Sequence, residues 1–182
     1  MKIMIKEQFI PSSISQDVRN FCYHLSPETK PIYVPVITEP YAKRLSCFPN
    51  VQTKVKNDGG TQVFGWSISE RIGLYLESQH HSVWRSSSGI LVDITPTEVE
   101  TDKVLFLEDP RLTYTGTTFQ HRHYALGDPA KVQKYISIQS TLLRSFGELV
   151  SCGYMPGDPV FKRLNPLMSE METLRHEIRS KT

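Results

Sequence analysis

The feature that most constrains the fold is a change in hydrophobic period at Gly59-Gly60. The preceding segment, 49–57, places Val51 and Val55 four residues apart, as on one face of a helix, whereas apolar and polar residues alternate after the glycines. Strand-like runs then follow one another without an intervening helical pattern, over residues 61–69, 74–84, 90–96, 103–110 and 111–126. The sequence therefore predicts an antiparallel sheet of four to six strands, not a doubly wound sheet.

Helical segments are predicted ahead of the sheet. Ser13 or Ser15 is suited to cap a short helix that ends near His24, and Pro49 is suited to the first position of the helix over 49–57. The proline-rich segment 26–36 lies between these helices. Because proline has no N–H to donate, this segment is expected to form an edge strand or an extended arm.

The last third of the chain is also predicted to be helical. Asp128 and Pro129 begin a long helix, and a second helix covers about 165–179. Apolar residues in the second helix recur at steps of four, three and four, as in a coiled-coil seam: Leu167, Met171, Leu174 and Ile178. They are expected either to pack on the domain or to mediate a homodimer. We therefore expect an α+β fold in one domain, residues 1–182, with a core over about 1–150 and a helical extension over about 160–180.

The composition is that of a soluble, folded protein. The chain has 182 residues, of which 38% are hydrophobic and 22% charged. Its 21 basic and 19 acidic residues are scattered, without the basic stripe of a nucleic-acid-binding protein. No apolar run approaches the ~20 residues that span a bilayer. We therefore expect neither a nucleic-acid partner nor a membrane partner.

Cysteine usage and the N-terminal residues bear on the cellular compartment. Cys22, Cys47 and Cys152 are odd in number and far apart, which argues against a disulfide framework and for a reducing environment. The first residues lack the apolar stretch and cleavage site of a secretory signal, so a cytoplasmic protein is expected. Gly59-Gly60 precedes a strand and not a helix, so it is no phosphate loop, and no cofactor is expected.

Three residues have the types and spacing of a thiol-based active site. Cys47 lies just ahead of the helix predicted at Pro49, where the helix dipole favours a thiolate. His80 and His81 lie on one predicted strand and Asp93 on the next, across a hairpin with its loop near 86–89. Strand alternation sends the two histidines to opposite faces, and His81 is nearer the position opposed to Asp93. The pattern predicts Cys47 as nucleophile, His81 as base and Asp93 as the residue that orients it.

The order of these motifs resembles the transglutaminase-like branch of the papain-like fold. The matching elements are a Cys before a helix, a strand with His near Trp (residues 80–84), and a strand with Asp followed by Thr-Pro (residues 93–96). The resemblance covers about residues 40–96. It implies a papain-like or transglutaminase-like core and a cysteine peptidase, amidase, deamidase or acyl transferase. It also implies a protein, peptide or glutamine-like amide as substrate.

Substrate-binding residues are expected beside the proposed triad. His80, on the strand face opposite to His81, is predicted to face a groove. Trp66 and Trp84, on neighbouring strands, are candidates to line a cleft, with the alternative that they are core aromatics.

Two other functions are compatible with the same residues. Cys47 as a buried, unreactive thiol would leave a non-catalytic module that binds a protein partner. Alternatively, His121 and His123 share a strand face and, with His81 and Asp93, provide the three or four ligands that zinc or iron takes. However, neither H-E-x-x-H nor paired C-x-x-C motifs are present, so no metal is assigned.

Overall fold

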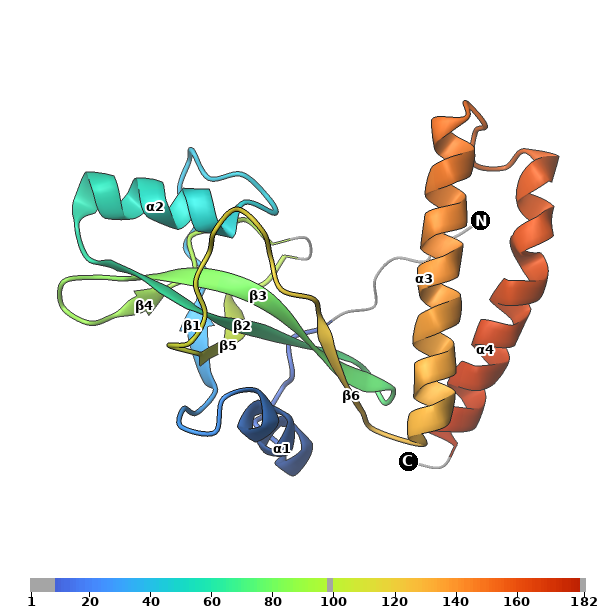
Figure 1. Ribbon diagram of the computed structural model, residues 1–182, viewed down its shortest axis with the longest axis horizontal. Coiled ribbons are helices and arrows are strands. Elements are labelled where there is room, and N and C mark those ends of the chain that lie inside the picture. Colours follow the sequence, from blue (N-terminus) through green and yellow to red (C-terminus); the bar gives the residue numbers. More distant parts are fainter. Residues whose placement is uncertain (1–8, 98–99, 181–182) are drawn as a thin grey trace. The chain divides into compact units, whose positions relative to one another are not determined.

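The computed structural model describes residues 9–97 and 100–180, and their contacts divide the chain into two compact units (Figure 1). The larger unit contains residues 9–70 and 76–124, and the smaller contains 71–75 and 125–180. The sequence predicts one domain with a helical extension from about 160. The smaller unit begins earlier, because the long helix that follows residue 128 shares a buried core with the last helix and with Leu74 and Tyr75.

The larger unit is built on the antiparallel sheet that the sequence predicts. Its strands are β1 (Ile32–Pro35), β2 (Thr61–Arg71), β3 (Tyr75–Arg85), β4 (Leu91–Val92), β5 (Lys103–Glu108) and β6 (Arg122–Ala125). They lie in the order β1-β5-β2-β3-β4, with β6 also paired to β3. The α+β prediction is therefore confirmed, and the proline-rich segment supplies an edge strand as expected.

Pairing beyond β4 ties the two ends of this strand order together. Val36, just after β1, forms a parallel bridge with Asp93, just after β4. The Asp93 N–H donates to the Pro35 carbonyl at 2.9 Å, and the Ile37 N–H donates to the Asp93 carbonyl at 2.9 Å. The backbone of Asp93 is therefore held by the segment that follows β1, in addition to its connection to the β3–β4 hairpin.

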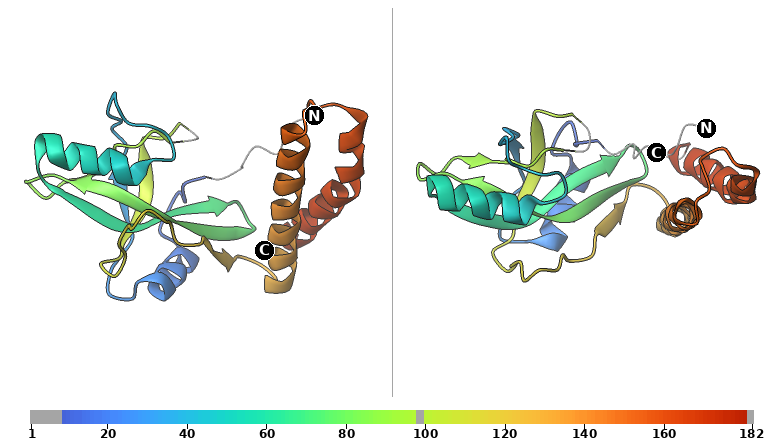
Figure 2. Two further views of the ribbon diagram at one scale, coloured as in Figure 1. Left: turned by 45° about the horizontal axis from the view of Figure 1, so that its top comes forward. Right: turned by 90° about the horizontal axis from the view of Figure 1, so that it is seen from above.

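Two helices belong to the larger unit. Helix α1 (Gln16–Leu25) is capped by Ser15, whose side chain accepts from the Val18 N–H, and it buries Val18, Phe21 and Cys22 as predicted. Helix α2 (Cys47–Asp58) lies along β3 and β4 in both figures (Figures 1 and 2). Its apolar side packs on the sheet through these residues: Val51, Val55, Trp84, Val92 and Ile94.

Three sequence predictions need correction. Helix α2 begins at Cys47 and not at Pro49, which lies at the third helical position, where a backbone N–H has no intrahelical acceptor. The strand expected over 90–96 is limited to Leu91–Val92, because Asp93 pairs with the segment after β1. The strand expected over 111–126 is limited to β6, because Gly116, at φ +98°, turns the chain within a loop over 110–121.

The smaller unit is a helical hairpin whose two helices are connected by residues 152–164. Helix α3 (Pro129–Ser151) runs beside α4 (Asn165–Arg179), with the 3-10 helix η1 (Pro159–Leu164) between them in sequence (Figures 1 and 2). Asp128 caps α3 by accepting from the Ala130 N–H at 2.9 Å. The predicted seam of α4 faces this core, with three of its residues buried: Met171, Leu174 and Ile178. No helix in the described part of the chain is long and apolar enough to cross a membrane.

Candidate active site

Cys47 is the first residue of helix α2 and is 8% exposed. The N-cap residue Ser46 makes no side-chain hydrogen bond to the helix. Because first-turn N–H groups have no intrahelical acceptor and Pro49 has no N–H, the amides of Cys47 and Phe48 are donors at the end of the helix dipole. Gln62 from β2 fixes this turn to the sheet by donating to the Phe48 carbonyl at 3.2 Å.

The predicted contact between His81 and Asp93 is present. Nε2 of His81 lies 2.8 Å from Oδ2 of Asp93, and the side chains are 16% and 1% exposed, respectively. The hairpin register explains the contact. Trp84 pairs with Val92 and Arg85 with Leu91, so continuing the register places Asp93 diagonally across from His81.

The charge state of His81 is set by its two neighbours. Burial alone would lower the pKa of its imidazole. However, the charge and hydrogen bond of Asp93, with the hydrogen bond and charge of Cys47, raise that pKa well above its ordinary value of 6.5. Since Nε2 is occupied by Asp93, Nδ1 is the ring nitrogen left to interact with the thiol. Asp93 and, to a smaller extent, Cys47 are therefore the groups that favour the protonated form of His81.

A polar network that the sequence reasoning missed holds Asp93 and α2 together. The Thr95 N–H donates to Oδ1 of Asp93 at 2.9 Å, and Oγ1 of Thr95 accepts from Nδ2 of Asn50 at 3.2 Å. Asn50, 5% exposed, also accepts from the Lys43 N–H at 3.0 Å and donates to the Lys43 carbonyl at 2.8 Å. Two sequence features indicate this network: an asparagine in the first turn of the helix, Asn50, and a threonine two residues after Asp93, Thr95.

His80 lies in an aromatic cluster with Phe48, the residue after Cys47. Its ring is 4.6 Å from that of Phe48, 5.0 Å from that of Phe119 and 6.1 Å from that of Trp66, measured between centroids. The ring of Tyr114 stacks on that of Phe48, with the two ring centroids 4.0 Å apart. The first turn of α2 is therefore bordered by aromatic side chains from β2, β3 and the loop over 110–121.

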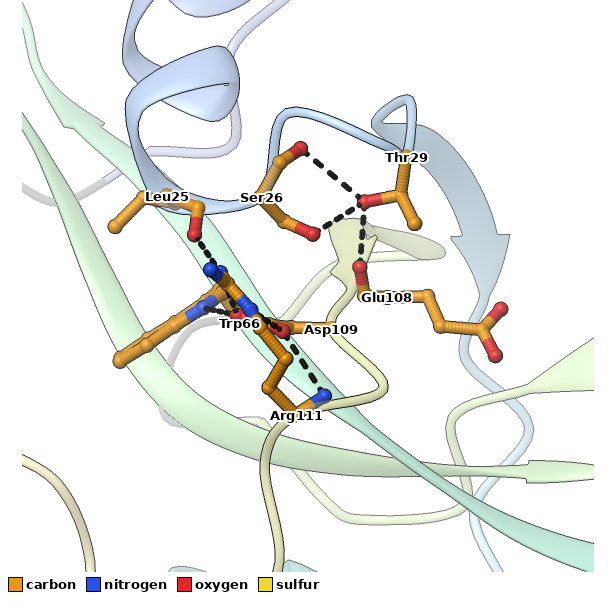
Figure 3. A network of polar contacts seen from close by, with 7 residues as sticks. All are labelled: Leu25, Ser26, Thr29, Trp66, Glu108, Asp109 and Arg111. Atoms are coloured by element: carbon orange, nitrogen blue, oxygen red, sulfur yellow. Dashed lines mark hydrogen bonds and ion pairs between the residues drawn. The ribbon is translucent and has the colours of Figure 1, made fainter.

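The base of the 110–121 loop is anchored by the polar network in Figure 3. Asp109, 1% exposed, accepts from Nε of Arg111 at 2.8 Å and from Nε1 of Trp66 at 3.2 Å. Arg111 also donates to the Leu25 carbonyl at the end of α1. Burial raises the pKa of Asp109, but the hydrogen bonds from Arg111 and Trp66 outweigh it and lower the pKa overall. These hydrogen bonds hold in place the first residues of the loop that carries Tyr114 and Phe119.

Trp84 is placed elsewhere. Its Nε1 donates to the Gly59 carbonyl at 2.9 Å, and the Lys54 ammonium lies 4.9 Å from its ring centroid. Its ring packs with Val51 under α2. Trp66 and Trp84 therefore belong to different clusters. Trp66 contacts His80, and Trp84 contacts the C-terminal end of helix α2.

The histidines considered as metal ligands are paired with carboxylates. Nδ1 of His121 lies 2.5 Å and Nε2 of His123 lies 3.7 Å from Oε1 of Glu77. Burial raises the pKa of Glu77, but the hydrogen bonds from the two histidines outweigh it and lower the pKa to about 2. Within residues 9–97 and 100–180, no group of three or more His, Cys, Asp or Glu side chains is arranged to hold a metal ion.

Comparisons with known proteins give no relative for this chain. No protein-family model, no characterised protein and no solved structure matches it.

Proposed function

We propose that the protein is a thiol-dependent hydrolase or acyl transferase that acts on an amide or peptide. One observation carries the proposal: the imidazole of His81 interacts with both Cys47 and the buried carboxylate of Asp93. A histidine held between a thiol and a carboxylate is the arrangement that nucleophilic cysteine catalysis needs. The cysteine also begins a helix, whose N-terminus favours negative charge on sulfur.

In this mechanism Nδ1 of His81 takes the proton of Cys47, and Asp93 stabilises the resulting imidazolium at Nε2. Sγ of Cys47 attacks the carbonyl carbon, and the electron pair of the C=O bond moves to oxygen. When the tetrahedral intermediate collapses, His81 gives its proton to the leaving amine, and a thioester remains on Cys47. Neutral His81 then takes a proton from water, or from an acceptor amine or alcohol, as its oxygen or nitrogen attacks the thioester carbon. The C–S bond breaks, the acyl group leaves on the acceptor, and the proton returns from His81 to the sulfur of Cys47.

The developing oxyanion needs fixed donors. The amides of Cys47 and Phe48 supply them at the uncapped start of α2. Asn50 and Thr95 are positioning residues in this account, because they connect the first turn of the helix to the carboxylate of Asp93. Small displacements of either end would separate the thiol from its base.

The substrate class comes from the transglutaminase-like and papain-like resemblance, which supports a peptide or a glutamine-like amide. A cytoplasmic location would suit the chemistry, since all three cysteines are free and a reducing compartment keeps Cys47 a thiol.

The test is formation of an acyl-enzyme. A Cys152→Ser background removes the exposed thiol, and buried Cys22 serves as an unreactive internal reference because burial raises its pKa to about 12. Incubation with p-nitrophenyl acetate is expected to release one burst equivalent of nitrophenolate and to leave one acetyl group, mapped to Cys47 by mass spectrometry.

Two variants make this result specific. Cys47→Ser should abolish the adduct, and His81→Gln should slow its formation by about 10-fold or more, since general-base catalysis contributes ~10²–10⁴. Fluorescence of Trp66 and Trp84, both in the larger unit, verifies folding of each variant. A folded protein with no adduct on Cys47, or with equal acylation in His81→Gln, would refute the proposed function.

A further inference from the structure

His80 is a buried polar side chain with one unused ring nitrogen. The imidazole is 6% exposed, and the Phe119 N–H donates to its Nδ1 at 3.4 Å. Nε2 is buried and has no hydrogen-bond partner among the described residues. A buried polar atom without a partner is costly and requires an explanation, of which a catalytic role is one.

The tautomer of His80 follows from its contacts. A nitrogen that accepts a hydrogen bond carries no proton, so in the neutral ring the proton is on Nε2. Burial, followed by the charge of His81, lowers the pKa of His80, so the neutral form prevails at pH 7. Nε2–H is therefore an unpaired neutral donor, the form in which an imidazole polarises a carbonyl without transferring a proton.

This donor lies beside the first turn of α2, which carries the nucleophile, on the face of β3 opposite to His81. The His80 ring lies 4.6 Å from the ring of Phe48, the residue after Cys47, and His80 precedes His81 in β3. The charge of His81 contributes, after burial, to the lowered pKa of His80. The amides of Cys47 and Phe48, at the uncapped start of α2, lie in the same first turn.

We propose that Nε2–H of His80 binds the carbonyl oxygen of the acyl substrate and stabilises the oxyanion, together with the first-turn amides of α2. This inference rests on the proposed function of Cys47. When Sγ attacks, the C=O electron pair moves to oxygen, and His80 donates a hydrogen bond while keeping its proton. Phe119 is a positioning residue, because its N–H fixes the tautomer that presents a donor at Nε2.

Two reactions of the same thiol separate this role from a structural one. Acylation by p-nitrophenyl acetate passes through an oxyanion, whereas alkylation by iodoacetamide is a displacement at carbon that forms none. Both rate constants are measured for Cys47 in the Cys152→Ser background. Loss of a single oxyanion donor costs ~10²–10³ in many enzymes. For a reactive aryl ester we expect a loss of about 10-fold in acylation and less than about 2-fold in alkylation.

A matched pair of substitutions assigns the effect to Nε2. The amide of His80→Asn falls near the position of Nδ1 and supplies no donor at Nε2, whereas the amide of His80→Gln reaches the position of Nε2. Acylation should therefore fall in His80→Asn and recover to within about 3-fold of the unsubstituted protein in His80→Gln. If His80→Asn does not fold, His80→Phe replaces it, since it keeps a ring against Phe48 and Phe119.

Each outcome decides between the two proposals. A selective loss of acylation in His80→Asn with recovery in His80→Gln supports the role of His80. Equal losses in acylation and alkylation, or no loss in either, overturn that role and leave the nucleophilic role of Cys47 intact. No acylation of Cys47 in the unsubstituted protein overturns both.

Discussion

Asp93→Asn is the substitution that most sharply tests the buried polar chain behind Cys47. The carboxylate is 1% exposed, lies 2.8 Å from Nε2 of His81 and accepts from the Thr95 N–H at 2.9 Å. Asparagine has nearly the same shape but only one acceptor oxygen, so one of the two donors would face an amide NH₂ group. The substitution thus removes an interaction without creating a cavity.

The expected loss of stability follows from the kind of hydrogen bond removed. A hydrogen bond to a charged group contributes ~1.5–3 kcal/mol, more than one between neutral groups. Since the His81 side chain is 16% exposed, water partly replaces the lost partner, and we expect about 2 kcal/mol. Alkylation of Cys47 should slow as well, because His81 loses the carboxylate that holds its proton.

The assay is urea unfolding followed by the fluorescence of Trp66 and Trp84, which report on the larger unit alone. A double-mutant cycle with His81→Gln isolates the pair, with an expected coupling energy of ~1–2 kcal/mol at pH 7. A cost below about 0.5 kcal/mol for Asp93→Asn, or a coupling energy near zero, would show that the contact between Asp93 and His81 does not stabilise the fold.

Asn50→Ala removes the hydrogen bonds to Lys43 and Thr95 and should lower the free energy of unfolding, measured in urea, by ~2 kcal/mol. The control Thr53→Ala, at an exposed position of the same helix, should lower it by less than ~0.5 kcal/mol. Equal losses in the two variants would contradict a stabilising role of the Asn50 network. Because the folded pKa of His81 is raised, its stabilisation is fully present below pH ~6.5 and is lost as the pH rises through the folded pKa. The stability gap to His81→Gln should therefore narrow in alkaline urea titrations, and a widening gap would contradict this sign. Gly65→Ala places a Cβ 2.1 Å from the Leu107 carbonyl oxygen and should unfold or strongly destabilise the larger unit, whereas Gly147→Ala, with open space in α3, should stabilise its helix by ~0.5–1 kcal/mol in thermal circular dichroism.

Local patterns predicted most of the fold, because local physics determines them. The capped helices begin at Ser15 and Asp128 as expected, since a side-chain oxygen satisfies the first-turn amides. The antiparallel sheet follows from alternation and from turn glycines such as Gly89, at φ +88°. The strand expected over 90–96 is shorter, because the partner of Asp93 lies after β1, and such a distant pairing leaves no periodic signal.

The candidate site was predictable only in part, for the same reason. The contact between His81 and Asp93 follows from the register of one hairpin, a local property. The cluster around His80 depends on Phe119, which reaches it from a loop of irregular structure, so sequence spacing does not reveal it. Trp84 shares a strand with His80, yet its indole bonds to Gly59 at the end of α2.

The rate of Cys47 alkylation by iodoacetamide depends directly on whether His81 activates this thiol. Rates are measured at pH 7 in the Cys152→Ser background by mass spectrometry, with Cys22 as the internal reference. The structure predicts selective labelling of Cys47 that slows by about 10-fold or more in His81→Gln. Labelling of Cys47 as slow as that of Cys22, or unchanged in His81→Gln, would contradict the account.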